Sequence, residues 1–343
     1  MERHKIFFVS LVLVLGGFLT THALLPNRSD PFTKPIDTQW IDLDGYRMSV
    51  IAEMKLNHAD VHDRYDIGLF GNSRSIKQSH SSIGFEDKTF FNFSILQSSF
   101  RNSVTMLEAL SKREKLPLLA VVSVDNFAIQ LATNPIEMPA NVRILGIGND
   151  WRAALSAPGI SLLNRLRIIS RTVMTESLIF VSMFKNELQR RLIRDAWRKI
   201  TGTPLLRPVG PEGYVKDGSR FQPYPTSDVP DFTGNVMLRI MPDLMMLDMQ
   251  RLASLKDANK NFDMVFYESP IKGGPGVSKA ALASRALFMQ LCERYKLICL
   301  TAPKSLPFPK LPWFDDSHPD PRSLGNYLNA IIREWHQHSP ASQ

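Results

Sequence analysis

The sequence predicts an α/β fold built around a doubly wound parallel sheet. The first observation behind this prediction is a series of short apolar runs, each typical of a strand that is buried on both faces. The second is that amphipathic segments with helical spacing lie between these runs, because strands that alternate with helices form parallel sheets. Such a sheet exposes its functional groups at the carboxyl ends of its strands, so the residues that follow each apolar run are candidates for a site.

Five apolar runs are the predicted strands: "YDIGLFG" (65–71), "TFFNFSIL" (89–96), "LLAVVSVD" (118–125), "DMVFYESP" (263–270) and "KLICLTAP" (296–303). Segments 101–115 and 276–295 are the clearest helices between them, because apolar residues recur along one face of each. A last helix is expected to start near Pro321. Residues 135–240 interrupt the alternation, and we expect an insertion there that forms a helical subdomain or lid. Within it, "YVKDGSRFQPY" (214–224) fits either a lid that binds a carbohydrate or acyl group or a plain surface loop.

The N-terminus carries an export signal. Arg3, His4 and Lys5 precede an apolar stretch of borderline length for a membrane span, which Pro26 ends. Residues 1–25 are therefore either a cleaved signal peptide or an uncleaved anchor with its cationic end in the cytoplasm, and we favour the anchor. We expect a protein anchored in the inner membrane that faces the periplasm or extracytoplasmic space, or a secreted one if the signal is cleaved.

The rest of the chain is predicted to be a Pro-punctuated linker and lead-in over 26–60, followed by one α/β domain over 61–340. Composition is that of a globular protein, with 44% hydrophobic residues in 343. The formal charge is +8, but basic and acidic residues are interspersed rather than gathered in a stripe. We therefore expect no nucleic-acid partner, and the sequence indicates no oligomeric state.

Cysteine and metal-ligand patterns exclude two further classes of protein. Cys292 and Cys299 are too few for a disulfide framework or a metal site. An oxidising compartment would allow them to pair, but their place where a predicted helix runs into a strand favours two buried thiols. His62, Asp63, His80 and Glu86 do not have the spacing of a metal-ligand set, so we expect no metal and no cofactor.

Ser73 is the candidate nucleophile. It follows the first predicted strand within "FGNSRS", where an α/β sheet exposes reactive side chains. The alternative is a helix cap, because serine is favoured at that position. Asn72 and Arg74 flank it and are candidates for binding substrate, with Arg74 suited to an acidic group or, equally, to a solvated helix start.

A possible base and its orienting carboxylate lie near the C-terminus in "FDDSH". Asp315 and His318 are three residues apart on a loop just before the last predicted helix. A serine nucleophile needs a base to take its proton and a carboxylate to fix the imidazole tautomer. The alternative is that the aspartate caps a turn and that His318 is a surface residue.

Together these blocks resemble the SGNH/GDSL hydrolase superfamily. The resemblance implies a flavodoxin-like three-layer sandwich with about five parallel strands, and a Ser73, His318 and Asp315 triad. "FFNFSILQSS" is similar to the family's second block, which implies an oxyanion donor at the backbone N–H of Gln97. "AVVSVDNFAI" is similar to the third block, which implies that the Asn126 side chain is a further donor beside the Ser73 N–H.

This chain departs from the family pattern at several positions. Asn72 stands where the family usually has aspartate, Gln97 where it has glycine, and Asp125 where a small residue precedes the asparagine. Asn149 in "LGIGNDW" is the alternative to Asn126, which we prefer because it directly ends a buried apolar run.

The resemblance implies an extracytoplasmic serine esterase or O-acyltransferase that acts on an acylated small molecule or a cell-envelope polysaccharide. The alternative is a non-catalytic scaffold or binding protein of an envelope assembly. An ordinary α/β-hydrolase is disfavoured because Ser75 occupies the last glycine position of a Gly-x-Ser-x-Gly elbow.

Overall fold

The computed structural model describes residues 31–33, 39–43, 48–96, 98, 100–124, 161–163, 166, 170, 200–202, 206–208, 213–222, 242–269, 279–300, 314 and 318–338. They form a parallel five-stranded sheet with the order β3-β2-β4-β8-β9. Its strands are β2 (Ile67–Phe70), β3 (Phe90–Asn92), β4 (Leu119–Val124), β8 (Asp263–Glu268) and β9 (Ile298–Leu300). All five predicted strands are therefore confirmed, in the strand order of a flavodoxin-like fold.

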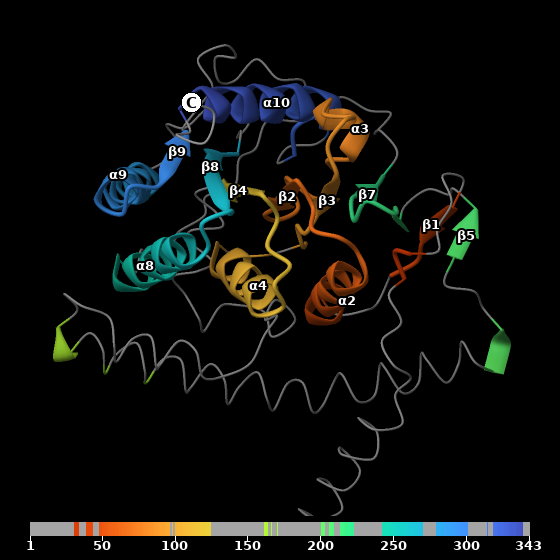
Figure 1. Ribbon diagram of the computed structural model, residues 1–343, viewed down its shortest axis with the longest axis horizontal. Helices are drawn as coiled ribbons and strands as arrows, with labels where there is room; N and C mark the ends of the chain where they lie inside the picture. The colour runs from red at the N-terminus through yellow and green to blue at the C-terminus, as the bar shows by residue number, and fades with distance from the viewer. Residues whose placement is uncertain are drawn as a thin grey trace, which may run out of the picture.

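Helices cover both faces of the sheet, as Figure 1 shows. One face carries α2 (Met48–Val61), α4 (Phe100–Lys112), α8 (Pro242–Ala258) and α9 (Lys279–Arg294). The other carries α10 (Pro321–His338) and the short α3 (His80–Ile83). The predicted three-layer sandwich is thus confirmed, and the last helix begins where the sequence indicates.

Alternation along the strands explains why both faces are covered. In β4, Ala120 and Val122 pack with the larger helical layer, whereas Leu119 and Val121 pack with α10. Every residue of β2 and β4 is buried, as the continuous apolar runs require. Asp320 starts α10, because its Oδ1 accepts from the backbone N–H groups of Arg322 at 2.8 Å and Ser323 at 3.2 Å.

A second, antiparallel sheet has the order β5-β1-β6-β7. It comprises β1 (Gln39–Ile41), β5 (Leu206–Pro208), β6 (Gly213–Tyr214) and β7 (Arg220–Phe221). Within the insertion predicted over 135–240, the described residues are helical at 162–163, 166, 170 and 200–201, and they form strands and a turn over 206–208 and 213–221. Most of residues 135–240 lie outside the described part of the chain.

The turn between β6 and β7 is part of the packed domain. The backbone N–H of Asn92, at the end of β3, donates to Asp217 O at 2.8 Å, and that of Arg220 donates to Ile76 O at 2.8 Å. Gly218 and Ser219 are buried. The loop over 214–224 was expected to be a lid or a surface loop, and its described residues instead form a turn fixed to the edge of the main sheet.

The lead-in segment also differs from the linker that the sequence suggests. β1 and α2 both fall within 26–60, and Ile51, Ala52 and Leu56 of α2 are buried in the core. The described residues of this segment therefore belong to the folded domain.

The expectation of two buried thiols is wrong, because Cys292 and Cys299 form a disulfide. It joins the last turn of α9 to β9, with a Cα–Cα distance of 6.2 Å. The polypeptide reverses between the two elements at Tyr295 and Lys296, which brings the two sulfur atoms together.

Candidate functional site

Ser73 lies just beyond the carboxyl end of β2. β2 lies between β3 and β4 in the sheet, so the connections that follow it run first to one side of β2 and then to the other. Open α/β sheets bind ligands in the crevice at such a switch point. The predicted position of the serine at a strand end is thus confirmed.

Asn72 shapes the turn that carries Ser73. Its backbone carbonyl accepts from the N–H groups of Ser75 and Ile76, both at 3.1 Å. Its side-chain Oδ1 accepts from the N–H of Arg74 at 3.0 Å. Asn72 is buried, so its carboxamide caps the turn. This contact supports a positioning role for a residue that the sequence suggested as a substrate ligand.

Ser73 itself takes no part in the capping. Among the described residues, neither its Oγ nor its backbone N–H makes a hydrogen bond, and the side chain is half-buried. The capping role that the sequence allowed for Ser73 is therefore carried out by Asn72. A serine hydroxyl and its own backbone N–H at a strand end are the kinds of group that nucleophilic attack and oxyanion binding use.

The floor beneath the turn is tightly packed and polar. A Cβ atom on Gly71 would lie 2.5 Å from Ser75 Oγ and 2.7 Å from Ser123 Cβ, so only glycine fits there. Ser75 Oγ lies 3.0 Å from Tyr267 Oη of β8, within hydrogen-bond distance. The turn is therefore seated against the ends of both β4 and β8.

Asn92, the last residue of β3, fastens the turn from the other side. Its Nδ2 donates to the carbonyl oxygens of Ser75 at 2.9 Å, Ile76 at 3.3 Å and Gln78 at 2.8 Å. Its Oδ1 accepts from the N–H of Ser94 at 2.9 Å. In the sequence this asparagine entered only as part of the second block. The signal that could have revealed its role is a carboxamide within an apolar run, because such a group is buried and must find hydrogen-bond partners.

The loop that carries His318 contacts the turn that carries Ser73. The N–H of Phe314 donates to His318 O at 2.8 Å, so these two residues lie together just before α10. The Lys77 ammonium lies 3.2 Å from the centroid of the buried Phe314 ring. Segments about 240 residues apart are thereby brought together, although no hydrogen bond joins Ser73 Oγ to His318 within the described part of the chain.

The other predicted site residues have different outcomes. Arg74 is only 8% exposed, which excludes the solvated helix start that its sequence position allowed. Asp315, Gln97, Asn126 and the alternative Asn149 lie outside the described residues. Among the described residues, no group of three or more His, Cys, Asp or Glu side chains could hold a metal ion.

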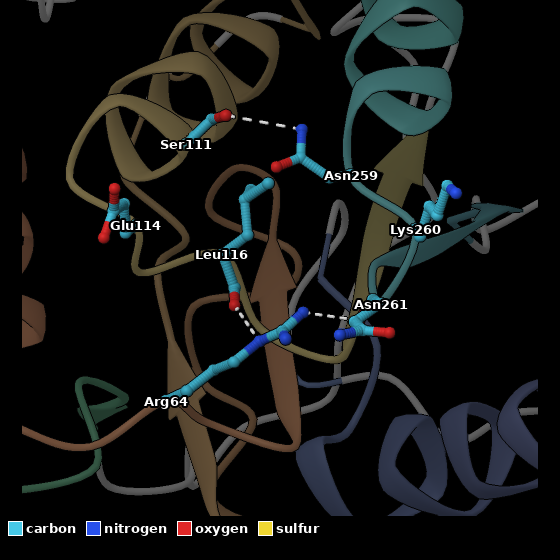
Figure 2. A pocket seen from close by; sticks show the side chains of 7 residues that line it. All are labelled: Arg64, Ser111, Glu114, Leu116, Asn259, Lys260 and Asn261. Atoms are coloured by element: carbon cyan, nitrogen blue, oxygen red, sulfur yellow. Dashed lines mark hydrogen bonds between the residues drawn. The ribbon is translucent and has the colours of Figure 1, made fainter.

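A hollow of about 260 Å³ lies at the other end of the strands from Ser73 (Figure 2). Arg64, which precedes β2, lies across it and donates from Nε to Leu116 O at 2.6 Å and from Nη2 to Asn261 O. These three residues precede β2, β4 and β8, so the hollow lies at the amino ends of the strands. It is therefore separate from the candidate site. Arg64 connects the segments that lead into β2, β4 and β8.

None of the described helices is long and apolar enough to cross a membrane, and residues 1–25 lie outside the described part. The chain was compared with protein-family models, curated proteins and solved structures, and nothing matched in any of the three.

Proposed function

We propose that this chain is a serine esterase or O-acyltransferase of the SGNH/GDSL type, which works through an acyl-enzyme on Ser73. The observation that carries the proposal is the state of Ser73 at the carboxyl end of β2. Its Oγ and N–H have no partners among the described residues, while Asn72 caps the turn in its place. The contact between Lys77 and Phe314 supports the pairing of this turn with the loop of His318.

In the acylation step, Ser73 Oγ forms a bond to the acyl carbonyl carbon while the His318 imidazole takes the hydroxyl proton. Asp315 would hold the imidazole in the required tautomer. The resulting oxyanion would be bound by the Ser73 N–H, with the Gln97 N–H and the Asn126 side chain as further donors. The intermediate collapses when the bond to the alcohol oxygen breaks, and that oxygen takes the proton from His318.

The second step returns the serine. Water or a sugar hydroxyl gives its proton to His318 and attacks the acyl carbon, and Ser73 Oγ leaves with that proton. Attack by water makes the protein an esterase, whereas attack by a sugar hydroxyl makes it an O-acyltransferase. The proposed substrates are acylated small molecules or cell-envelope polysaccharides, and the positive net charge suits an anionic polymer.

The proposed compartment lies outside the cytoplasm. The disulfide between Cys292 and Cys299 supports this location, since disulfides form and persist in oxidising compartments. The apolar stretch within residues 1–25 would attach the protein to the membrane unless it is cleaved.

A serine-directed fluorophosphonate probe tests the proposal. We expect the folded wild-type protein to be labelled, Ser73→Ala to be unlabelled, and His318→Ala to be labelled far more slowly. Ser81→Ala is the matched control, because Ser81 is an exposed serine of α3 and its loss should leave labelling unchanged.

Two results would contradict the proposal. Labelling that persists in Ser73→Ala would show that another nucleophile reacts. A folded wild-type protein that no fluorophosphonate labels would favour the alternative, a non-catalytic scaffold or binding protein of an envelope assembly.

A further inference from the structure

Lys55 of α2 is a lysine in the interior of the protein, with its side chain fully buried. Its Nζ donates to the carbonyl oxygens of Asn92, Ser94 and Gly218, each at 2.7 Å. An ammonium has three N–H bonds and a neutral amine has two, so the three carbonyls match the charged form. The ring of Tyr214 lies 5.3 Å from Nζ and adds a weaker cation–π contact.

Burial of this charge is costly, so its surroundings must compensate. Desolvation lowers the pKa of Lys55 well below its usual value, and the nearby carboxylate of Asp217 opposes that shift. Asp217 is itself fixed, because its Oδ2 accepts from His80 N at 2.7 Å and its Oδ1 from Ser219 Oγ at 2.6 Å. The buried cation thus holds together α2, the end of β3 and the β6–β7 turn.

Asn92 connects Lys55 to the turn that carries Ser73. Lys55 binds the carbonyl of Asn92, and the Asn92 carboxamide binds the carbonyls of Ser75, Ile76 and Gln78. Ile95, one residue after Ser94, donates its N–H to Gly71 O at 3.0 Å. Lys55 therefore binds the end of β3 on one side. On its other side, the end of β3 is hydrogen-bonded to both ends of the turn that carries Ser73.

We propose that Lys55 is a positioning residue for the Ser73 site, and that its buried ammonium fixes the nucleophile turn through Asn92. The β6–β7 turn, which supplies Gly218 and Asp217, is then a structural part of the site rather than a lid over it. The effect on reactivity rests on the function proposed above, whereas the effect on the turn does not.

Saturation kinetics with the fluorophosphonate probe test the first effect. Lys55→Ala leaves three buried carbonyl oxygens without their donor, so we expect it to lower the maximal labelling rate constant roughly 10- to 100-fold. The apparent dissociation constant of the probe should stay unchanged, because Lys55 does not reach the probe. Methylammonium should restore part of the rate, whereas methanol, which is uncharged, should not.

Amide hydrogen exchange tests the second effect and does not depend on catalysis. We expect the amides of Ser75 and Ile76, which bond to Asn72 O, to exchange at least tenfold faster in Lys55→Ala, with those of α10 unchanged. Lys115→Ala is the matched control, because the Lys115 ammonium likewise donates to a backbone carbonyl, that of His62, but this residue directly follows α2 and does not contact the turn of Ser73. It should behave as the wild type in both measurements.

Asn92→Asp provides a second variant in case Lys55→Ala does not fold. It keeps the acceptor for Ser94 N and removes the donors to the nucleophile turn. It should reproduce the faster exchange and the slower labelling. Wild-type exchange of the turn amides in a folded Lys55→Ala or Asn92→Asp protein would overturn the proposal. An unlabelled wild type with faster exchange in the variants would instead contradict only the proposed enzyme.

Discussion

The Lys77 ammonium lies 3.2 Å from the centroid of the Phe314 ring, and this contact joins the turn after β2 to the loop before α10. It connects the segment that carries Ser73 to the segment that carries His318. Cation–π contacts are typically worth about 0.5–2 kcal/mol. The contact is therefore strong enough to influence the distance between these two segments without determining the fold.

Lys77→Met tests that influence, because it keeps the apolar stem and removes the charge. We expect the fluorophosphonate labelling rate to fall about 2- to 30-fold, in line with the loss of one cation–π contact. The unfolding midpoint in denaturant should fall modestly, because the same contact also stabilises the folded state. Lys88→Met, which removes an exposed lysine paired with Asp87, is the control, and equal labelling rates in the two variants would contradict the prediction.

Gly218→Ala should destabilise the β6–β7 turn. Gly218 has a φ of 77°, and a Cβ atom there would lie 2.5 Å from Asn92 O. Gly202→Ala is a close control, because Gly202 has a φ of 64° but nothing within 4 Å of its Cβ position. Strain alone costs about 1–3 kcal/mol, so Gly218→Ala should lower the free energy of unfolding by more than Gly202→Ala does. Equal losses in urea denaturation would show that the close approach to β3 is not rigid.

Tyr327→Phe should reduce the loss of stability at alkaline pH. Burial, followed by the neighbouring Tyr267 and Glu268, raises the pKa of Tyr327 above its usual value of 10.0. The unfolded chain therefore releases this proton at a lower pH than the folded protein does. The contribution of Tyr327 is fully present below pH 10 and is lost as pH rises above it. The phenol also donates to Glu268 O at 3.1 Å, so Tyr327→Phe should be less stable at neutral pH.

The measurement is the free energy of unfolding between about pH 7 and pH 11, the range around the usual tyrosine pKa. The difference between the wild type and Tyr327→Phe should shrink as pH rises above 10. A difference that is constant across this range would contradict the assigned pKa direction.

Reduction of the disulfide should lower stability while leaving the site intact. The two cysteines are seven positions apart, and closing so short a loop is worth roughly 2–3 kcal/mol in the chain-entropy model. Dithiothreitol should lower the urea midpoint of the wild type, but not that of a Cys292→Ala/Cys299→Ala variant. Fluorophosphonate labelling of folded protein should be equal with and without reductant, because β9 is three strands away from β2 in the sheet.

Continuous apolar runs made the main sheet predictable. β2 is buried at all four positions and β4 at all six, and such strands stand out in a sequence without reference to distant residues. Ser73 was found for the same reason, because its place depends only on where β2 ends. Position in the sequence could not decide which residue caps the turn, because that depends on whether Asn72 or Ser73 accepts from the turn's N–H groups.

Contacts between distant residues account for most of what the sequence did not reveal. Lys55 meets its carbonyl partners at separations of 37, 39 and 163 residues, and a lysine within a helix is normally solvated. The strands of the antiparallel sheet are two or three residues long, too short for a periodic pattern. The disulfide depends on the reversal at Lys296, whose φ of 52° is not encoded by hydropathy.

The β6–β7 turn also changes what the main sheet can do with other polypeptides. A sheet edge with unpaired N–H and C=O groups is a template for further strands, including strands of other copies. At the β3 edge, Asn92 N already bonds to Asp217 O and the carbonyl of Asn92 to Lys55, so an incoming strand would find these groups occupied. At the other edge, β9 has only three residues and is covalently tied to α9. The contacts of Asn92 that fix the candidate site thus also hinder the addition of a further strand at this end of β3.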